Sequence, residues 1–118
     1  MQKIYTIYHN PRWGKSRRSV QILKENNLDF SVFEYLKSPI SKQDLRNISK
    51  SLNLRPAKFI RKNEKIYKEL DIENYLNDDD RLYELIIKYP ILMERPIIIQ
   101  NNKKAVIGRP PENILTLL

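Results

Sequence analysis

Residues 3–36 read KIYTIYHNPRWGKSRRSVQILKENNLDFSVFEYL, and this stretch predicts a strand, a helix and a second strand in succession. Residues 3–8 are rich in β-branched and aromatic side chains, as strands are, and Asn10-Pro11 is a turn signal. Ser16 is the expected cap of the following helix, and residues 30–36 return to strand composition. Two strands joined by one helix form a βαβ unit, so we expect these two strands to be parallel.

The middle of the chain, residues 38–90, reads as an all-helical insertion. Ser41 followed by Asp44 is a capping-box signal, and apolar residues recur behind it at helical spacing. Arg55-Pro56 interrupts that helix. Asp78-Asp79-Asp80 starts a further helix, because acidic residues in a first turn suit the helix dipole.

The end of the chain returns to strands. Residues 96–100 and 103–107 have strand composition, and Asn101-Asn102 between them predicts an antiparallel hairpin. Residues 112–118 suit a last helix. The predicted fold is therefore α/β and occupies residues 1–118 as a single domain. It contains a mixed four-stranded sheet, built as βαβ and then ββα, with the helical insertion between the two halves.

Composition excludes several kinds of chemistry. The 118 residues contain no cysteine, which removes disulfides, thiolate metal sites, iron–sulfur clusters and thiol catalysis. His9 is the single histidine, so we expect no metal site and no cofactor. No apolar run approaches the roughly 20 residues that a bilayer-spanning helix needs. The first residues lack the apolar run of a secretory signal, so we expect a soluble, cytoplasmic protein without membrane association.

The chain is basic. Its 22 lysines and arginines, against 14 aspartates and glutamates, give a formal net charge of +8. This balance attracts anions and gives salt-sensitive, non-specific affinity for nucleic acid. The sequence contains no recognised nucleic-acid-binding motif, so specific nucleic-acid binding is not expected. The runs of like charge in the insertion are expected to be mostly solvated surface.

The loop after the first predicted strand is one candidate site. Ligands of open α/β sheets bind beyond the carboxyl ends of the strands, and a helix N-terminus there presents free N–H groups to an anion. A glycine in such a loop permits a close backbone approach or a positive φ. The loop residues of interest are His9, Asn10, Gly14, Ser16 and Arg17. The alternative is an ordinary β–α turn whose basic side chains point into water.

Three arginines in distinctive sequence surroundings form a second candidate site. Arg61 lies in a basic run, Arg95 precedes Pro96, and Arg109 lies between a glycine and a proline. The planar guanidinium fork suits oxyanions. Spacing alone does not bring the three together, and surface salt bridges are the alternative. The Arg95-Pro96 bond is a candidate cis peptide, although most X–Pro bonds are trans.

Trp13 is the single tryptophan, and it falls in the glycine-containing loop. Large apolar rings are seldom placed in loops without a partner. The ring could act as a lid, stack on Arg12 or mark a binding surface. The alternative is that it packs into the core from the loop.

Four motifs together resemble the glutaredoxin-coupled arsenate reductase family. They occur in the family's order across residues 4–115, nearly the whole chain. The motifs are Tyr8-His9-Asn10-Pro11-x-x-Gly14-x-Ser16-Arg17, Arg61-Lys62-Asn63, Pro90-Ile91-Leu92-x-x-Arg95-Pro96-Ile97, and Arg109-Pro110. The resemblance implies a thioredoxin-like fold with a helical insertion, which agrees with the pattern described above. It also extends to the related Spx-type regulators, which bind RNA polymerase and are similar to this chain in residues 95–99.

The resemblance also implies roles for individual positions. The family's loop cysteine attacks arsenate, and glutaredoxin and glutathione resolve the adduct; Trp13 occupies that position here. The family's three oxyanion-binding arginines match Arg61, Arg95 and Arg109. Its loop histidine, serine and arginine match His9, Ser16 and Arg17, and the histidine assists thiolate formation. The resemblance therefore implies that the anion-binding arginines are present in this chain and that the nucleophilic cysteine is absent.

Three functions follow as hypotheses. The first is a non-redox binder of an oxyanion, such as arsenate, phosphate or sulfate, or of another acidic ligand. The second is an Spx-like protein-interaction module that binds RNA polymerase. The third is an arsenate reductase by ancestry, with residual activity or none, because Ser16 as a substitute nucleophile cannot be oxidised to a disulfide.

Overall fold

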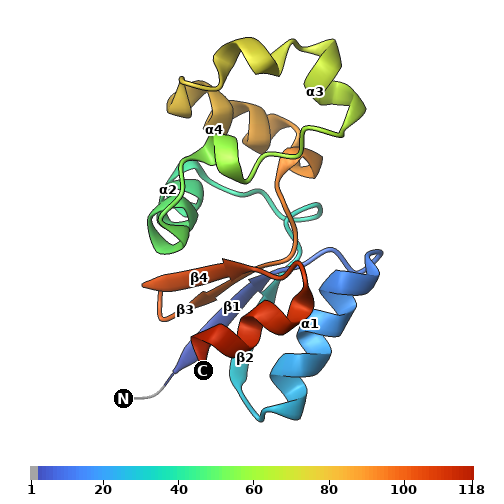
Figure 1. Cartoon of the computed structure of the whole chain (residues 1–118), viewed down its shortest axis with the longest axis vertical. Helices are drawn as coiled ribbons and strands as arrows, with labels where there is room; N and C mark the ends of the chain where they lie inside the picture. Colours follow the sequence, from blue (N-terminus) through green and yellow to red (C-terminus); the bar gives the residue numbers. More distant parts are fainter. Residues whose placement is uncertain (1–2) are drawn as a thin grey trace.

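The computed structural model describes residues 3–118, and its centre is a mixed four-stranded sheet in the order β2-β1-β3-β4 (Figure 1). Strand β1 (Ile4–Tyr8) pairs in parallel with β2 (Asp29–Phe33), and helix α1 (Gly14–Glu25) connects the two strands. Strand β3 (Ile97–Gln100) runs antiparallel to both β1 and β4 (Lys104–Ile107). The predicted fold class is confirmed.

Helices and turns fill the chain between β2 and β3, and they lie on the side of the sheet opposite helix α1 (Figure 1). An isolated antiparallel β-bridge between Ile60 and Met93 joins the middle of this segment to its end. The elements are α2 (Lys42–Leu52), the 3₁₀-turn η1 (Pro56–Lys58), α3 (Lys65–Glu69), η2 (Ile72–Tyr75), α4 (Asp79–Lys88) and η3 (Pro90–Leu92).

Local sequence signals account for where the two longer helices of this segment start. Ser41 and Asp44 form the expected capping box, each side chain accepting a hydrogen bond from the other residue's backbone N–H. Asp78 caps α4 by accepting from the Arg81 N–H at 3.1 Å. Acidic side chains in the first turn of α4 also complement the helix dipole.

Alternation along β3 divides the core in two. Ile98 packs with Tyr5 and Ile7 against residues of α1 and of the C-terminal 3₁₀-helix η4 (Pro111–Leu117). Ile97 and Ile99 face the opposite side and pack with residues of α2, α4 and η3. Successive strand residues point to opposite faces, so one short strand holds both layers together.

Three expected boundaries are wrong. The second strand ends at Phe33 rather than at residue 36, because the chain turns at Glu34 and carries Tyr35 into the core. Helix α1 starts at Gly14 with Trp13 as its cap residue, so Ser16 lies inside the helix and does not cap it. The hairpin turn spans residues 101–103, with Asn101 and Asn102 both at positive φ.

Candidate functional site

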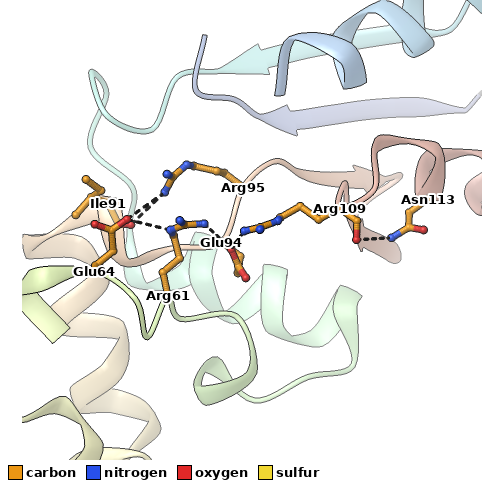
Figure 2. A network of polar contacts seen from close by, with 7 residues as sticks. All are labelled: Arg61, Glu64, Ile91, Glu94, Arg95, Arg109 and Asn113. Atoms are coloured by element: carbon orange, nitrogen blue, oxygen red, sulfur yellow. Dashed lines mark hydrogen bonds and ion pairs between the residues drawn. The ribbon is translucent and has the colours of Figure 1, made fainter. Parts of the chain in front are cut away.

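Arg61, Arg95 and Arg109 converge on one small volume although 48 positions separate the first from the last (Figure 2). Backbone contacts bring them there. The Arg61 N–H donates to the Leu92 carbonyl at 2.6 Å, and the Glu94 N–H donates to the Phe59 carbonyl at 2.8 Å. These bonds flank the Ile60–Met93 bridge and hold Arg61 beside the approach to β3.

The segment after β4 places the third arginine. The Gly108 N–H donates to the Pro96 carbonyl at 2.8 Å, so Arg109 follows directly beside the Arg95-Pro96 step. A Cβ at Gly108 would lie 2.7 Å from Pro96 Cγ, so glycine is required for this close approach. Both Arg95-Pro96 and Arg109-Pro110 are cis peptide bonds.

Two carboxylates link the three guanidiniums. Glu64 Oε1 lies 3.1 Å from Arg61 Nε and 3.8 Å from Arg95 Nη1. Glu94 Oε1 lies 2.9 Å from Arg61 Nη1 and 3.1 Å from Arg109 Nη1. We call these five residues the arginine cluster; with three positive and two negative charges it keeps one positive charge in excess.

Trp13 covers one side of the arginine cluster. Its ring centroid lies 3.8 Å from Arg95 Cζ and 5.2 Å from Arg61 Cζ, which is cation–π geometry. Of the alternatives for this ring, the contacts are those of a lid, with Arg95 and Arg61 rather than Arg12 as its cationic partners. Trp13 itself remains partly in contact with solvent, since 42% of its surface is exposed. The ring lies as a lid on two of the arginines.

Arg95 is the most buried charge of the cluster, with 2% of its surface exposed. Within residues 3–118 its Nε has no hydrogen-bond partner, and its Nη1 reaches the Ile91 carbonyl only at 3.4 Å. Burial lowers the pKa of the Arg95 guanidinium from its ordinary value, while Glu64 and Glu94 act in the opposite direction. The two carboxylates therefore help to keep a desolvated cation charged.

Tyr35 is a second buried group near these arginines. It is 1% exposed, and its hydroxyl makes no hydrogen bond of ordinary geometry to a described residue. Burial raises the pKa of Tyr35 to about 12, while Arg95, by its charge and as a side-chain hydrogen-bond donor, and Arg61, by its charge, act in the opposite direction. The Tyr35 hydroxyl and the Arg95 guanidinium therefore lie close together on the buried side of the arginine cluster.

The loop before α1 is fixed by a histidine–serine contact. His9 Nδ1 lies 2.8 Å from Ser16 Oγ, and the same oxygen accepts from the Asn10 N–H at 3.0 Å. Burial lowers the pKa of His9, with Glu34 raising it and Arg17 lowering it to smaller extents. Because Ser16 is fully buried, its hydroxyl holds the loop together and is not presented to a ligand.

Gly14, the first residue of α1, is not at positive φ, so that reason for a glycine in the loop is not met. A Cβ at Gly14 would meet only the Arg17 guanidinium, at 3.8 Å, so packing within the chain does not require glycine there. Trp13 makes no side-chain cap, and the first backbone bond of the helix runs from the Arg17 N–H to the Trp13 carbonyl. Arg17 Nη1 itself donates to the Pro11 carbonyl at 3.0 Å.

A cavity of about 320 Å³ adjoins the arginine cluster on the side of Arg61 and Arg109. Lys62 and Asn63 from the predicted Arg61-Lys62-Asn63 motif line it, together with Ile60 and Glu94. Sequence reasoning found the cations of this cavity and missed both glutamates. A local signal existed for Glu64, which follows its partner Arg61 by three residues, but not for Glu94, whose partners lie 33 and 15 positions away.

Within residues 3–118 no group of three or more histidine, cysteine, aspartate or glutamate side chains is arranged to hold a metal ion. None of the helices described is both long enough and apolar enough to cross a bilayer.

Comparison with known proteins gives consistent similarities. The model of the ArsC family matches residues 8–117. The chain is 41% identical to an arsenate reductase of Neisseria meningitidis serogroup A, covering 95% of this chain and 96% of that one. It is 40% identical to the uncharacterized protein YfgD of Escherichia coli K12, over 100% and 99% of the two chains. The solved structure of an arsenate reductase from Vibrio cholerae superposes with a TM-score of 0.93 at 34% identity over the full length of both chains.

Proposed function

The chain belongs to the ArsC family, and from that membership we propose that it binds oxyanions or other acidic ligands without redox chemistry. The observation that carries the proposal is the convergence of three arginines around only two carboxylates. Guanidinium forks offer paired donors that match tetrahedral and planar oxyanions alike. The excess positive charge of the arginine cluster favours an anionic ligand over a neutral one.

The absent thiol argues against reduction. Arsenate reduction moves two electrons, and the family's route begins at a cysteine that this chain does not contain. Trp13 stands at that position, and indole supplies only an N–H donor. Ser16 is buried against His9, and its oxygen cannot pass electrons on by forming a disulfide. The groups that remain can bind an anion but cannot reduce it.

Glu94 is the group that a ligand would displace. It bridges Arg61 and Arg109 beside the cavity that Lys62 also lines. An anion entering there meets three cations and competes with a single carboxylate. Arg109 is 39% exposed along its side chain, so its guanidinium is reachable from solvent. The alternatives, a reductase by ancestry with residual activity or none and an Spx-like module that binds RNA polymerase, stay predictions, because no contact of the arginine cluster favours either.

Thermal unfolding with added anions tests the proposal. Arsenate, phosphate and sulfate, each compared with chloride at matched ionic strength, should raise the melting temperature, because a ligand that binds only the folded state stabilises it. Arg109→Ala should abolish the increase without unfolding the protein, since this side chain is partly exposed.

Arg12→Ala is the matched control. Arg12 is exposed, lies next to Trp13 in the loop, and makes no ion pair within residues 3–118. Its removal lowers the net charge by the same amount and should leave the anion response intact. A melting temperature that does not respond to any of the three anions would refute the proposed function. If both variants lose the anion-induced rise equally, the rise depends on net charge and not on the arginine cluster.

A further inference from the structure

Three cavities meet at one exposed side chain, Leu54, which is 37% exposed, and one of them extends as far as Glu94 and Arg109 of the arginine cluster. We call their combined lining the Leu54 surface. It lies over the C-terminal end of α2 and the neighbouring edge of the sheet, at β4. The Leu54 surface shares Glu94 and Arg109 with the arginine cluster and Lys62 with the anion cavity, but Leu54, Lys50 and Lys58 belong to neither, so substitutions at these three test the surface separately.

The first cavity, of about 520 Å³, is the apolar part of the Leu54 surface. It runs between the end of α2 and the edge strand β4, where no further strand covers the sheet. Five of its eight lining residues are apolar: Leu52, Leu54, Ala105, Val106 and Ile107. An apolar groove beside a sheet edge is a recurrent docking position for peptides.

The other two cavities, of about 360 and 450 Å³, are the basic part. Their linings, taken from residues 3–118, contain five cationic side chains and no carboxylate. Arg46 and Arg55 are each paired with an aspartate of α4, at 3.7 and 2.9 Å. Lys50 and Lys58 make no ion pair with any residue the structure describes. The five cations are Arg46, Lys50, Arg55, Lys58 and Lys62.

The turn after α2 holds Leu54 in place. Asn53 adopts the left-handed conformation at φ 56°, and the Leu54 N–H donates to the Ser49 carbonyl at 3.0 Å. The Leu54 carbonyl accepts a hydrogen bond from the Ser49 hydroxyl. Both backbone groups of Leu54 are therefore bonded, and its exposed side chain is presented from a rigid turn with little further entropy to lose on binding.

We propose that the Leu54 surface docks an acidic segment of a partner protein through an apolar side chain placed beside Leu54. The apolar groove supplies the buried contact and the unpaired lysines supply charge complementarity, which together set affinity and orientation. Nucleic acid fits less well, because base stacking needs an exposed aromatic ring. The aromatic residue in these linings is Tyr83, which is 6% exposed.

The test is fluorescence anisotropy with a labelled peptide in which two leucines precede a run of aspartates. The whole protein should bind it saturably and lose affinity as salt rises. Leu54→Ser should weaken binding about tenfold, in the range of interface anchor residues. The double variant Lys50→Glu with Lys58→Glu should weaken it at least as much. Melting temperatures of both variants confirm that they are folded.

Matched controls separate the surface from the overall charge. Lys3→Glu with Lys24→Glu makes the same charge change at exposed positions outside the three cavities, and it should bind the peptide like the parent apart from a small, salt-dependent loss. A peptide with serines in place of the leucines should bind weakly, and one with lysines in place of the aspartates should not bind.

Three results would overturn the proposal: no saturable binding of the leucine–aspartate peptide, equal losses in the test and control double variants, or tighter binding of a labelled single-stranded oligonucleotide with the same dependence on Lys50 and Lys58. None of these bears on the thermal response to oxyanions, because every substituted residue lies outside the arginine cluster.

Discussion

Replacing Glu94 by glutamine separates the two effects of this carboxylate, which stabilises the fold and competes with a ligand. Its Oε1 bonds Arg61 at 2.9 Å and Arg109 at 3.1 Å, and the side chain is three-quarters buried. A hydrogen bond to a charged group contributes about 1.5–3 kcal/mol. Glutamine keeps an oxygen that can accept from the two guanidiniums but loses the carboxylate charge, so we expect Glu94→Gln to lower the free energy of unfolding by about 1–3 kcal/mol.

The same substitution should tighten anion binding. With Glu94 uncharged, the arginine cluster changes from one excess positive charge to two, and Arg61 and Arg109 lose their competing carboxylate. We expect sulfate to bind about tenfold more tightly, which corresponds to about 1.4 kcal/mol. Urea unfolding in chloride measures the first effect, and calorimetric titration with sulfate measures the second.

The opposite signs of the two effects make this a sharp test. Glu112→Gln is the control, because Glu112 is mostly exposed and its contact with Arg18 is long, at 3.9 Å. That variant should change neither quantity measurably. Weaker or unchanged sulfate binding by Glu94→Gln, alongside measurable binding by the parent, would refute the idea that this carboxylate occupies the ligand's place.

Three further predictions concern the lid, the loop and the packing. Trp13→Cys should gain arsenate-dependent oxidation of NADPH in a glutaredoxin-coupled assay while the parent matches the blank, and a silent variant would mean that more than the thiol has been lost. His9 has a lowered pKa, so the unfolded chain binds more protons: stability should fall as the pH drops from about 6.5 towards the folded pKa. The free energy of unfolding, measured with urea at several pH values across this range, should change less with pH in His9→Gln. An identical pH dependence in the variant and the parent would contradict the assignment. Gly108→Ala should cost about 1–3 kcal/mol in urea unfolding, because its Cβ would lie 2.7 Å from Pro96 Cγ. Gly14→Ala should cost nothing or stabilise, and equal costs at both glycines would be inconsistent with the packing.

Local chemistry made most of the fold predictable. The Ser41–Asp44 capping box and the Asp78 cap each depend on residues within one turn, and both are formed in the structure. The boundaries that failed depended on tertiary contacts. Ser16 has the composition of a helix cap, but its hydroxyl bonds His9 from inside the helix.

The site was predictable in its cations and not in its pairing. Arg61, Arg95 and Arg109 were singled out from their sequence surroundings and from the family resemblance, yet their convergence depends on the Ile60–Met93 bridge, which no local pattern encodes. The same holds for Glu94, whose two partners lie 33 and 15 positions away in the sequence. Contacts of this kind, between residues far apart in the sequence, depend on the topology of the fold and not on neighbouring residues.

The fluorescence of Trp13 reports anion binding at the arginine cluster without any added label. Trp13 is the single tryptophan of the chain and lies 3.8 Å from Arg95, so its emission reports directly on the arginine cluster. Titrating the protein with arsenate at constant ionic strength should change this emission saturably, and Arg109→Ala should remove the change. Emission that stays constant through the titration, or changes equally with chloride, would contradict anion binding at this cluster.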